Sequence, residues 1–544
     1  MFKVSTLRFS RIKKSASIPK VAYLAGMVAL FAIIPIFYIL IRATGADVEV
    51  WQRIIQTRLI TLMSNTILLV LVVTTGTVIV GVSMAWLTER TNLPGRRIFR
   101  WILALPLAIP AYIGAIIHLA ILRPRGGLLP QWLDQINLGF IQLPNPTGFW
   151  GAAFVLTIFS FPYVFLLTGA AFRSLNASFD EAARMLGRSP WQTFWHVTLP
   201  VIRPGIAAGA LLVALDILAE YGTVALLRFE TFSSAIFVQL AGRYDRSAAS
   251  ILSGILILLA LVILFTEFRI QQKSKFTQID SNWRPAKLIG LGKFRIAAFF
   301  LVLSFAVISF IIPIGLLIGW SISGLLNDSI LSAMQLGSLG LGNYVFNSFW
   351  SSALAALIAV VLSLPVAIFV SRHPGKISFL FSRLSQVGYA IPGVVVALSL
   401  VLLVNQFLPF LYATPMVIVM AYVVRYIPQA VRSSEATISQ LSVSVEEAAR
   451  LLKHNPVQTF INVTLPLILP GLLAGSALVF MSSLKELPAT LLLRPAGFET
   501  LAVRVWIWSE EGFYFQAAPA ALLLVITSII PLYFLLRREA IFKR

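Results

Sequence analysis

The stretch EAARMLGRSPWQTFWHVTLPVIRPG occupies residues 181–205, and EAARLLKHNPVQTFINVTLPLILPG occupies residues 447–471. The two copies align without a gap, and 16 of their 25 positions are identical. Both are polar segments between long apolar ones. Apolar helices resemble one another by composition alone, because Leu, Ile, Val and Ala fill most of their positions, whereas two polar loops do not. The duplication therefore predicts that both loops perform the same task.

The rest of the chain has the composition of an integral membrane protein. Of its 544 residues, 58% are hydrophobic and 12% charged, and the mean hydropathy is +0.88, well outside the range of soluble domains. A helix needs about 20 apolar residues to cross a bilayer core of roughly 30 Å, and uninterrupted apolar runs exclude the alternating pattern of a membrane barrel. We therefore predict an all-α, polytopic membrane protein. About twelve transmembrane helices are expected, at residues 21–41, 62–88, 101–122, 149–172, 204–227, 248–268, 296–320, 347–370, 384–407, 413–431, 470–493 and 515–536.

The net charge of +22 does not indicate nucleic-acid binding, because the basic residues form no contiguous patch. They lie in alternate loops: with the N-terminus in the cytoplasm, 30 Lys and Arg residues fall on the cytoplasmic side and 9 on the opposite side. This asymmetry predicts that both termini are cytoplasmic and that lipid surrounds the chain. The apolar run at 21–41 is too long for a cleaved signal peptide, so we interpret it as the first membrane helix.

The repeat extends beyond the two loops. Asn65 and Pro110 correspond to Asn347 and Pro392, each 282 residues further on, whereas Pro162 corresponds to a proline 266 residues further on. The first half therefore carries 16 extra residues, which we assign to a Pro- and Gly-rich external loop. Six spans per half form a parallel repeat, so both polar loops emerge on one face. We expect a first half at 1–268, a cytoplasmic linker at 269–294 and a second half at 295–544.

Each polar loop is expected to form two short helices that meet at a corner. Residues 181–186 favour a helix, and Gly187 can end it in a left-handed conformation. The Ser-Pro pair at 189–190 can begin the next helix, with serine as N-cap and proline at the first helical position. The Asn-Pro pair at 455–456 has the same role in the second copy.

These residues resemble the EAA loop of ABC importer permeases, whose pattern is Glu-Ala-Ala, three residues, Gly, nine residues, Ile, one residue and Leu-Pro. In the first loop (181–200) the matching residues are Glu181, Ala182, Ala183, Gly187, Leu199 and Pro200. In the second loop (447–466) they are Glu447, Ala448, Ala449, Leu465 and Pro466. Lys453 stands where the pattern has glycine, and valine replaces isoleucine in both copies, so the second corner is expected to differ in shape.

The resemblance implies a permease subunit in a bacterial plasma (inner) membrane. Its two loops would couple to two copies of a cytoplasmic ABC ATPase, and an external, periplasmic-type binding protein would deliver the cargo. The sequence contains no G-x-x-x-x-G-K-[ST] pattern, so we expect ATP on the partner and no cofactor, catalytic residue or metal ligand on this chain. An ion-coupled secondary transporter is the alternative of a different class, because it also has two parallel six-helix halves.

Three segments resemble the ferric iron subgroup of these permeases: EYGTVALLRFETFSSAIF at 220–237, VVRYIPQAVRSS at 423–434 and KELPATLLLRPAGFETLAVRVW at 485–506. Two fused halves are also typical of that subgroup. Thiamine permeases share the fused plan, so thiamine or another small solute is the alternative cargo. Tyr221, Tyr244 and Tyr426 could contact a ferric ion, although a structural role is the preferred interpretation of each, and the four histidines are scattered.

Ionisable residues inside membrane spans are costly and usually face a pathway or another helix. Glu220 in the fifth span corresponds to Glu486 in the eleventh, and Asp216 and Lys485 lie close by in the sequence. Our hypothesis is that these four residues line or gate the outer part of a translocation pathway, near helix interruptions at Gly222 and at the proline that follows Glu486. Structural contacts between helices are the alternative.

Overall fold

The computed structural model describes residues 20–141, 143–273, 284, 287–326, 340–451 and 455–541. Within this part of the chain the fold is all-helical, as predicted, and the one β-bridge joins Thr91 to Ile289. The bounds of the helices before residue 275 are α1 (Lys20–Thr44), α2 (Val48–Ile54), α3 (Ile60–Arg90), α4 (Arg96–Ile102), α5 (Ala111–Leu122), α6 (Leu128–Gln135), α7 (Gly148–Ser174), α8 (Ala177–Met185), α9 (Pro190–Thr193), α10 (Leu199–Ala219), α11 (Gly222–Leu226), α12 (Phe232–Phe237) and α13 (Arg246–Lys273).

The later helices repeat much of this order. Their bounds are α14 (Arg295–Ala306), α15 (Ile312–Leu326), α17 (Leu341–Arg372), α18 (Lys376–Gln386), α19 (Gly393–Phe407), α20 (Pro415–Gln440), α21 (Val443–Leu451), α22 (Pro456–Thr459), α23 (Leu465–Leu484), α24 (Pro488–Leu493), α25 (Leu501–Glu510) and α26 (Tyr514–Ile541). Short 3₁₀ turns, Leu105–Ala108 and Val387–Ala390, precede α5 and α19 at matching places.

Helices lie in all twelve expected ranges, and up to eleven of these ranges qualify as membrane spans by length and composition. Nine segments of the described chain are long and apolar enough to cross a membrane, and two bent pairs bring the number to eleven. The bends are sharp: 95° between Arg96–Ala108 and α5, and 106° between Lys376–Ala390 and α19. The remaining expected span, 413–431, is the continuous helix α20, which is less apolar because it carries Arg425, Gln429 and Arg432.

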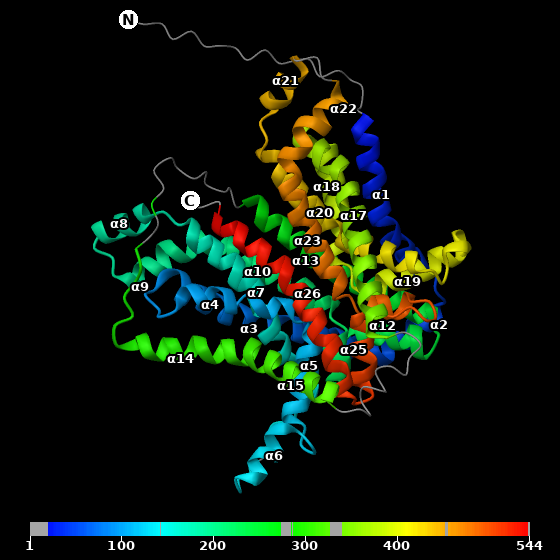
Figure 1. Ribbon diagram of the computed structural model, residues 1–544. Helices are drawn as coiled ribbons and strands as arrows, with labels where there is room; N and C mark the ends of the chain where they lie inside the picture. The colour runs from blue at the N-terminus through cyan, green and yellow to red at the C-terminus, as the bar shows by residue number, and fades with distance from the viewer. Residues whose placement is uncertain are drawn as a thin grey trace, which may run out of the picture.

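The helices form two arms that diverge from a common base (Figure 1). One arm carries α8 and α9 at its tip, and the other carries α21 and α22; the base lies around α5, α12 and α25. The opening helices cross between the arms: α1 packs against α17, α18 and α19, while Val302 and Ala306 of α14 are buried in a cluster with Met84 of α3. The two halves of the sequence are thereby interlocked.

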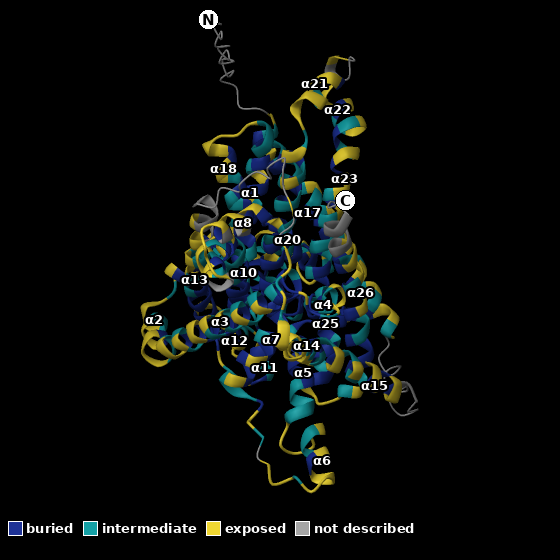
Figure 2. Cartoon of the chain, turned by 90° about the vertical axis from the view of Figure 1, so that its left-hand side faces the viewer, coloured by how far each residue is buried: buried dark blue, intermediate teal, exposed yellow. Residues whose placement is uncertain are grey.

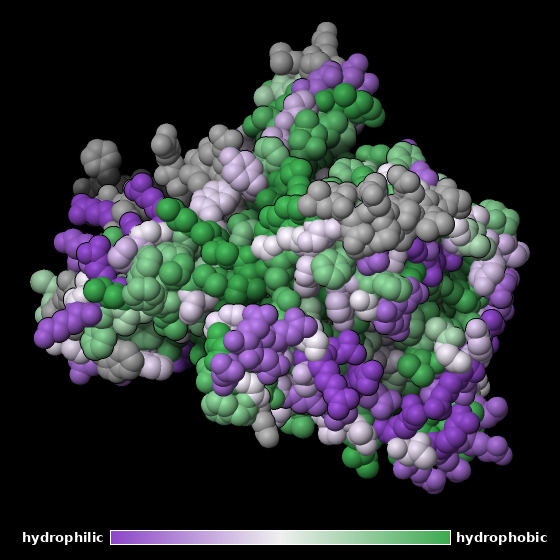
Figure 3. Space-filling model, turned by 60° about the horizontal axis from the view of Figure 1, so that its bottom comes forward, coloured by the Kyte–Doolittle hydropathy of each residue, from purple (hydrophilic) through white to green (hydrophobic). Residues whose placement is uncertain are grey.

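Within each arm, small residues let the helices approach closely, as is common in membranes. A Cβ added to Gly209 of α10 would lie 2.8 Å from the Cα of Val164 in α7. Gly475 of α23 has the same relation to α20, with a contact of 2.8 Å to the Cβ of Ser433. Buried residues fill the centre of the molecule (Figure 2), and broad apolar areas lie between polar ones on its surface (Figure 3), as expected for a protein in lipid.

Candidate coupling loops and translocation pocket

The first polar loop has the predicted shape of two helices meeting at a corner. Helix α8 ends at Met185, and Gly187 adopts the left-handed conformation expected of it, with φ = 75°. The backbone N–H of Gln192 donates to the Ser189 hydroxyl at 3.3 Å, and the Ser189 N–H donates to the Gln192 side chain at 3.0 Å. Ser189 therefore caps α9, and the chain then continues into α10.

The second polar loop repeats this arrangement where it is described. Helix α21 ends at Leu451, and Lys453 lies outside the described residues, so the shape of the second corner stays a prediction. Asn455 caps α22 through the same reciprocal pair as in the first copy: the Gln458 N–H donates to Asn455 Oδ1 at 2.8 Å, and the Asn455 N–H donates to Gln458 Oε1 at 3.0 Å.

The Glu-Ala-Ala triplets are oriented alike in the two loops. Glu181 and Glu447 are exposed, whereas the last alanine of each triplet, Ala183 and Ala449, is 4% and 5% exposed. Apolar side chains next to the triplets are unusually accessible; they are Met185, Leu186 and Leu451, at 89%, 78% and 86% exposure. Exposed apolar groups beside an exposed acidic residue suit a protein-docking surface.

An ion pair ties the second loop to the transmembrane helices. Arg372, the last residue of α17, donates to Glu446 Oε1 at 2.8 Å and to the carbonyl of Leu441 at 3.2 Å. Thr464, which directly precedes α23, donates to the same Glu446 oxygen at 3.4 Å. Since Arg372 and Glu446 are each 14% exposed at the side chain, this contact connects α21 to three spans in a largely dry environment.

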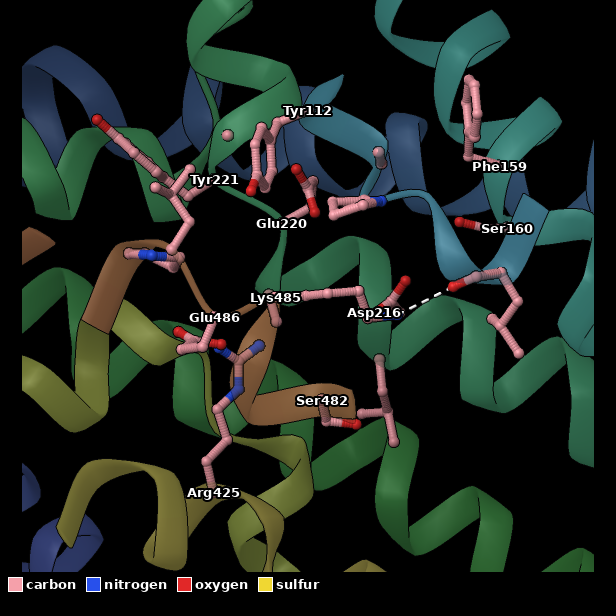
Figure 4. A pocket seen from close by; sticks show the side chains of 18 of the residues that line it. Tyr112, Phe159, Ser160, Asp216, Glu220, Tyr221, Arg425, Ser482, Lys485 and Glu486 are labelled. Carbon is pink, nitrogen blue, oxygen red and sulfur yellow. Dashed lines mark hydrogen bonds and ion pairs between the residues drawn. The ribbon is translucent and has the colours of Figure 1, made fainter. Parts of the chain in front are cut away.

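A pocket of about 140 Å³ lies between the two arms, near their base. Its walls come from both halves: the first contributes the turn before α5 and parts of α7 and α10, and the second contributes α20 and the end of α23 (Figure 4). All four sequence-predicted pathway residues, Asp216, Glu220, Lys485 and Glu486, line it. The structure therefore brings together residues up to 270 positions apart in the sequence.

Both predicted helix interruptions are present, and they position the glutamates. Helix α10 ends at Ala219, Glu220 is extended, and α11 begins at Gly222; in the second half α23 ends at Leu484 and α24 begins at Pro488. Each glutamate accepts a backbone N–H from the short helix that follows. Thr223 donates to Glu220 Oε1 at 2.8 Å, and Ala489 donates to Glu486 Oε1 at 3.2 Å.

The negative charge of Glu486 is neutralised by a cation of the same half of the repeat. Its second carboxylate oxygen accepts hydrogen bonds from the guanidinium of Arg425 and from the hydroxyl of Tyr426, the latter at 2.5 Å. Gly393 makes room for this ion pair, because a Cβ there would lie 2.3 Å from Glu486 Oε1. Glu486 is 4% exposed, so the charge pair is buried.

The first half provides no such partner for its acids. Among the described residues, neither Asp216 nor Glu220 forms an ion pair, and Asp216 has no side-chain hydrogen bond. Lys485 of the second half donates to the carbonyl of Leu107 at 2.9 Å, which links the two walls across the pocket (dashed line in Figure 4). Of the residues described, no three His, Cys, Asp or Glu side chains are grouped to hold a metal ion.

The tyrosines named from the sequence are engaged in other ways. Tyr221 stacks on Phe237 at 4.3 Å between ring centroids, Tyr244 is 80% exposed, and Tyr426 donates to Glu486. Sequence reasoning missed Arg425 and Tyr112 as pocket residues. The arginine had a signal, because a charge inside an otherwise apolar helix is itself an indication of function; the tyrosine had none.

Comparison with known proteins gives the family. A family model described as "Binding-protein-dependent transport system inner membrane component" matches residues 77–273 and again residues 363–539. The chain is 33% identical over 518 residues to "Fe(3+)-transport system permease protein FbpB 2" of Haemophilus influenzae, covering 94% of this chain and 97% of that protein.

Two further relatives are more distant. The chain is 25% identical to "Ferric transport system permease protein FbpB" of Actinobacillus pleuropneumoniae, covering 90% of this chain and 73% of the relative. "Sulfate transport system permease protein CysW" of Escherichia coli K12 is 28% identical and covers 47% of this chain with 89% of its own length. A relative that matches about half of the chain agrees with a duplicated unit.

Proposed function

The chain belongs to the family of binding-protein-dependent transport system inner membrane components, and on that premise we propose that this ABC importer permease carries ferric iron into the cell. It is a multi-pass membrane protein and the permease subunit, so ATP hydrolysis belongs to a partner ATPase. The observation that supports iron is the similarity to a ferric permease over 94% of the chain. Membership of this family argues against the alternative that the chain is an ion-coupled secondary transporter.

Two cytoplasmic ATPase copies would dock on the two loops, one per loop. The proposal rests on the duplicated geometry: an exposed glutamate at 181 and 447, a buried alanine two residues later, and accessible apolar side chains beside them. ATP would be held by these partners. Both termini would lie in the cytoplasm with the loops, as the distribution of basic residues predicts, and residues 269–294 would link the halves.

The pocket would be the point where cargo passes between the arms after an external binding protein releases it. ATP-driven approach of the two ATPase copies would move the loops, and the contacts of Arg372 and Glu446 would carry that motion into α17, α20 and α23. Because the nucleotide states favour different packings of the same helices, access to the pocket would alternate between the two sides. Asp216, Glu220, Lys485 and Glu486 would line or gate this passage.

The cargo is tested by uptake in cells that express the chain together with its ATPase and binding protein and lack other iron importers. We expect ATP-dependent accumulation of radiolabelled ferric ion and none of radiolabelled thiamine. Uptake of thiamine without iron would overturn the assignment of cargo while leaving the family unchanged.

The loop assignment is tested by ATPase co-purification. Replacing Glu181 and Glu447 together by alanine should abolish recovery of the ATPase with the permease, whereas Glu49→Ala, which alters an exposed acid on α2, should not. Intact assembly and uptake in the double variant would contradict the docking role.

A further inference from the structure

The pocket walls have diverged at positions that the repeat makes equivalent. Four first-half residues, Phe159, Ser160, Asp216 and Ala219, correspond to Arg425, Tyr426, Ser482 and Lys485, each 266 residues further on, and all eight line the pocket. Among the residues that line the pocket, both cations, Arg425 and Lys485, belong to the second half, whose one acid is Glu486. The first half contributes two acids, Asp216 and Glu220, and no cation.

This difference changes the chemistry of the shared glutamate. Glu486 is held by Arg425 and Tyr426, but the first half has Phe159 and Ser160 at the corresponding positions, and neither can supply a cation to Glu220. A buried carboxylate without a cation is costly unless a partner arrives during function. The first-half wall therefore holds two acids, Asp216 and Glu220, whose charges no described side chain pairs within ion-pair distance.

Tyr112 is a second, independent sign of a ligand. Its side chain is 4% exposed, lines the pocket and points toward Glu220 (Figure 4), yet its hydroxyl has no hydrogen-bond partner. Buried hydroxyls are nearly always paired, so each exception requires an explanation. The ring reaches this place because Gly222 has no side chain: a Cβ there would lie 2.8 Å from Tyr112 Cβ. The equivalent residue of the second half is Val394, which has no donor atom.

We propose that Tyr112, Asp216 and Glu220 form a transient binding site for the ferric ion on its way through the permease. The inference depends on the proposed function, since it assumes that iron is the cargo. Carboxylate and phenolate oxygens are hard ligands suited to a small, highly charged cation. When Fe³⁺ binds, the O–H bond of Tyr112 breaks, its proton leaves to water, and an Fe–O bond forms. Three anionic oxygen donors then balance the three positive charges of the ion, with no change of oxidation state.

A transport site must also let its ion leave. Lys485 lines the same pocket as Asp216, and its ammonium group donates to the Leu107 carbonyl of the opposite wall. When the arms move and this hydrogen bond breaks, the ammonium group becomes free to approach Asp216 and to compete with the ion for that carboxylate. Release would therefore be coupled to the movement of the arms.

The first test uses the purified complex of full-length permease and ATPase, without the binding protein. Tyr112→Phe removes the phenol, and Tyr422→Phe is its matched control, because Tyr422 is a fully buried tyrosine whose hydroxyl pairs with Thr490 outside the pocket lining. Titration of the permease–ATPase complex with ferric citrate should produce the visible charge-transfer band of an iron–phenolate bond. The band should be lost in Tyr112→Phe and retained in Tyr422→Phe.

Transport in vesicles gives the second readout. Asp216→Asn and Glu220→Gln keep the shape of each side chain, and glutamine retains an oxygen for the Thr223 N–H. Each should lower ferric uptake about tenfold or more, which corresponds to roughly 1.4 kcal/mol, while the ATPase still co-purifies with the permease in wild-type amounts. Normal iron uptake in all three variants, or the absence of the band from the wild type, would overturn the site without affecting the cargo; a wild type that imports no iron would instead overturn the proposed function.

Discussion

Glu220 and Glu486 occupy equivalent positions in the repeat, and replacing each with glutamine should have unequal effects on stability. Glu486→Gln removes the partner of a buried guanidinium, because Arg425 and Glu486 are 14% and 3% exposed at the side chain. Breaking such a pair by neutralising one member costs about 3–5 kcal/mol. Asp216 also attracts Arg425, which favours the lower end of that range.

Glu220→Gln breaks no ion pair, and the glutamine oxygen can still accept the Thr223 N–H. It loses about 1 kcal/mol through the weaker neutral hydrogen bond and gains a comparable amount because one of two nearby unpaired charges disappears. The net change should therefore be within about 1 kcal/mol of zero.

Thermal unfolding of the purified permease measures the difference. At roughly 2.1 cal/mol/K of unfolding entropy per residue, about 3–5 kcal/mol corresponds to a fall of about 3–4 °C in apparent Tm for Glu486→Gln, against about 1 °C or less for Glu220→Gln. Adding Arg425→Met to Glu486→Gln should recover at least half of the loss, because the guanidinium that lost its carboxylate partner is then removed as well. Equal losses at the two positions would refute the claim that only one glutamate is neutralised by its own half.

Three further predictions follow from the helix contacts. Arg372→Ala should abolish stimulation of ATP hydrolysis by the loaded binding protein while the ATPase still co-purifies, because the link from Glu446 to α17 is lost; unchanged stimulation would show that the link carries no motion. Gly209→Ala and Gly475→Ala should each destabilise the protein by about 1–3 kcal/mol, seen as a lower apparent Tm, since the added methyl group lies 2.8 Å from the facing helix; an unchanged Tm would mean that the helices move apart at little cost. Gly187→Ala should cost about 1 kcal/mol in the left-handed conformation and weaken ATPase binding severalfold in a pull-down titration, with no effect expected if the corner changes shape on docking.

The all-helical fold and its repeat were predictable because their signals are local. Span length follows from apolar runs, and the corner of the first loop follows from Gly187 and the Ser-Pro pair, each of which has its own backbone preference. The break after Glu220 was likewise predictable from Gly222. The sharp bends before α5 and α19 were not, because each lies within a single apolar run that is long enough to cross the membrane.

The pocket was only half predictable. Ionisable residues inside spans stand out in any membrane sequence, and all four of the residues selected in this way line the cavity. The partner of Glu486 could not be chosen from the sequence, because Arg425 lies 61 residues away and its orientation depends on how α20 packs against α23. Tyr112 could not be identified at all, since only the three-dimensional packing shows that its hydroxyl lacks a partner.

The Glu-Ala-Ala loops and the pocket differ in how closely the two halves of the repeat resemble each other. Two identical ATPase copies, as proposed, would need two equal docking surfaces, and the Glu-Ala-Ala loops are alike in sequence, capping and burial. A single ion passing between the halves, as proposed, would need one site, whereas a symmetric pocket would provide two weak ones on either side of the axis. Arg425 pairs with Glu486, while the position equivalent to Arg425 is Phe159 in the first half, so one glutamate is paired within the protein and the other would be available to a ligand. On the proposed function, the repeat would therefore keep its symmetry at the docking loops and lose it at the site of the cargo.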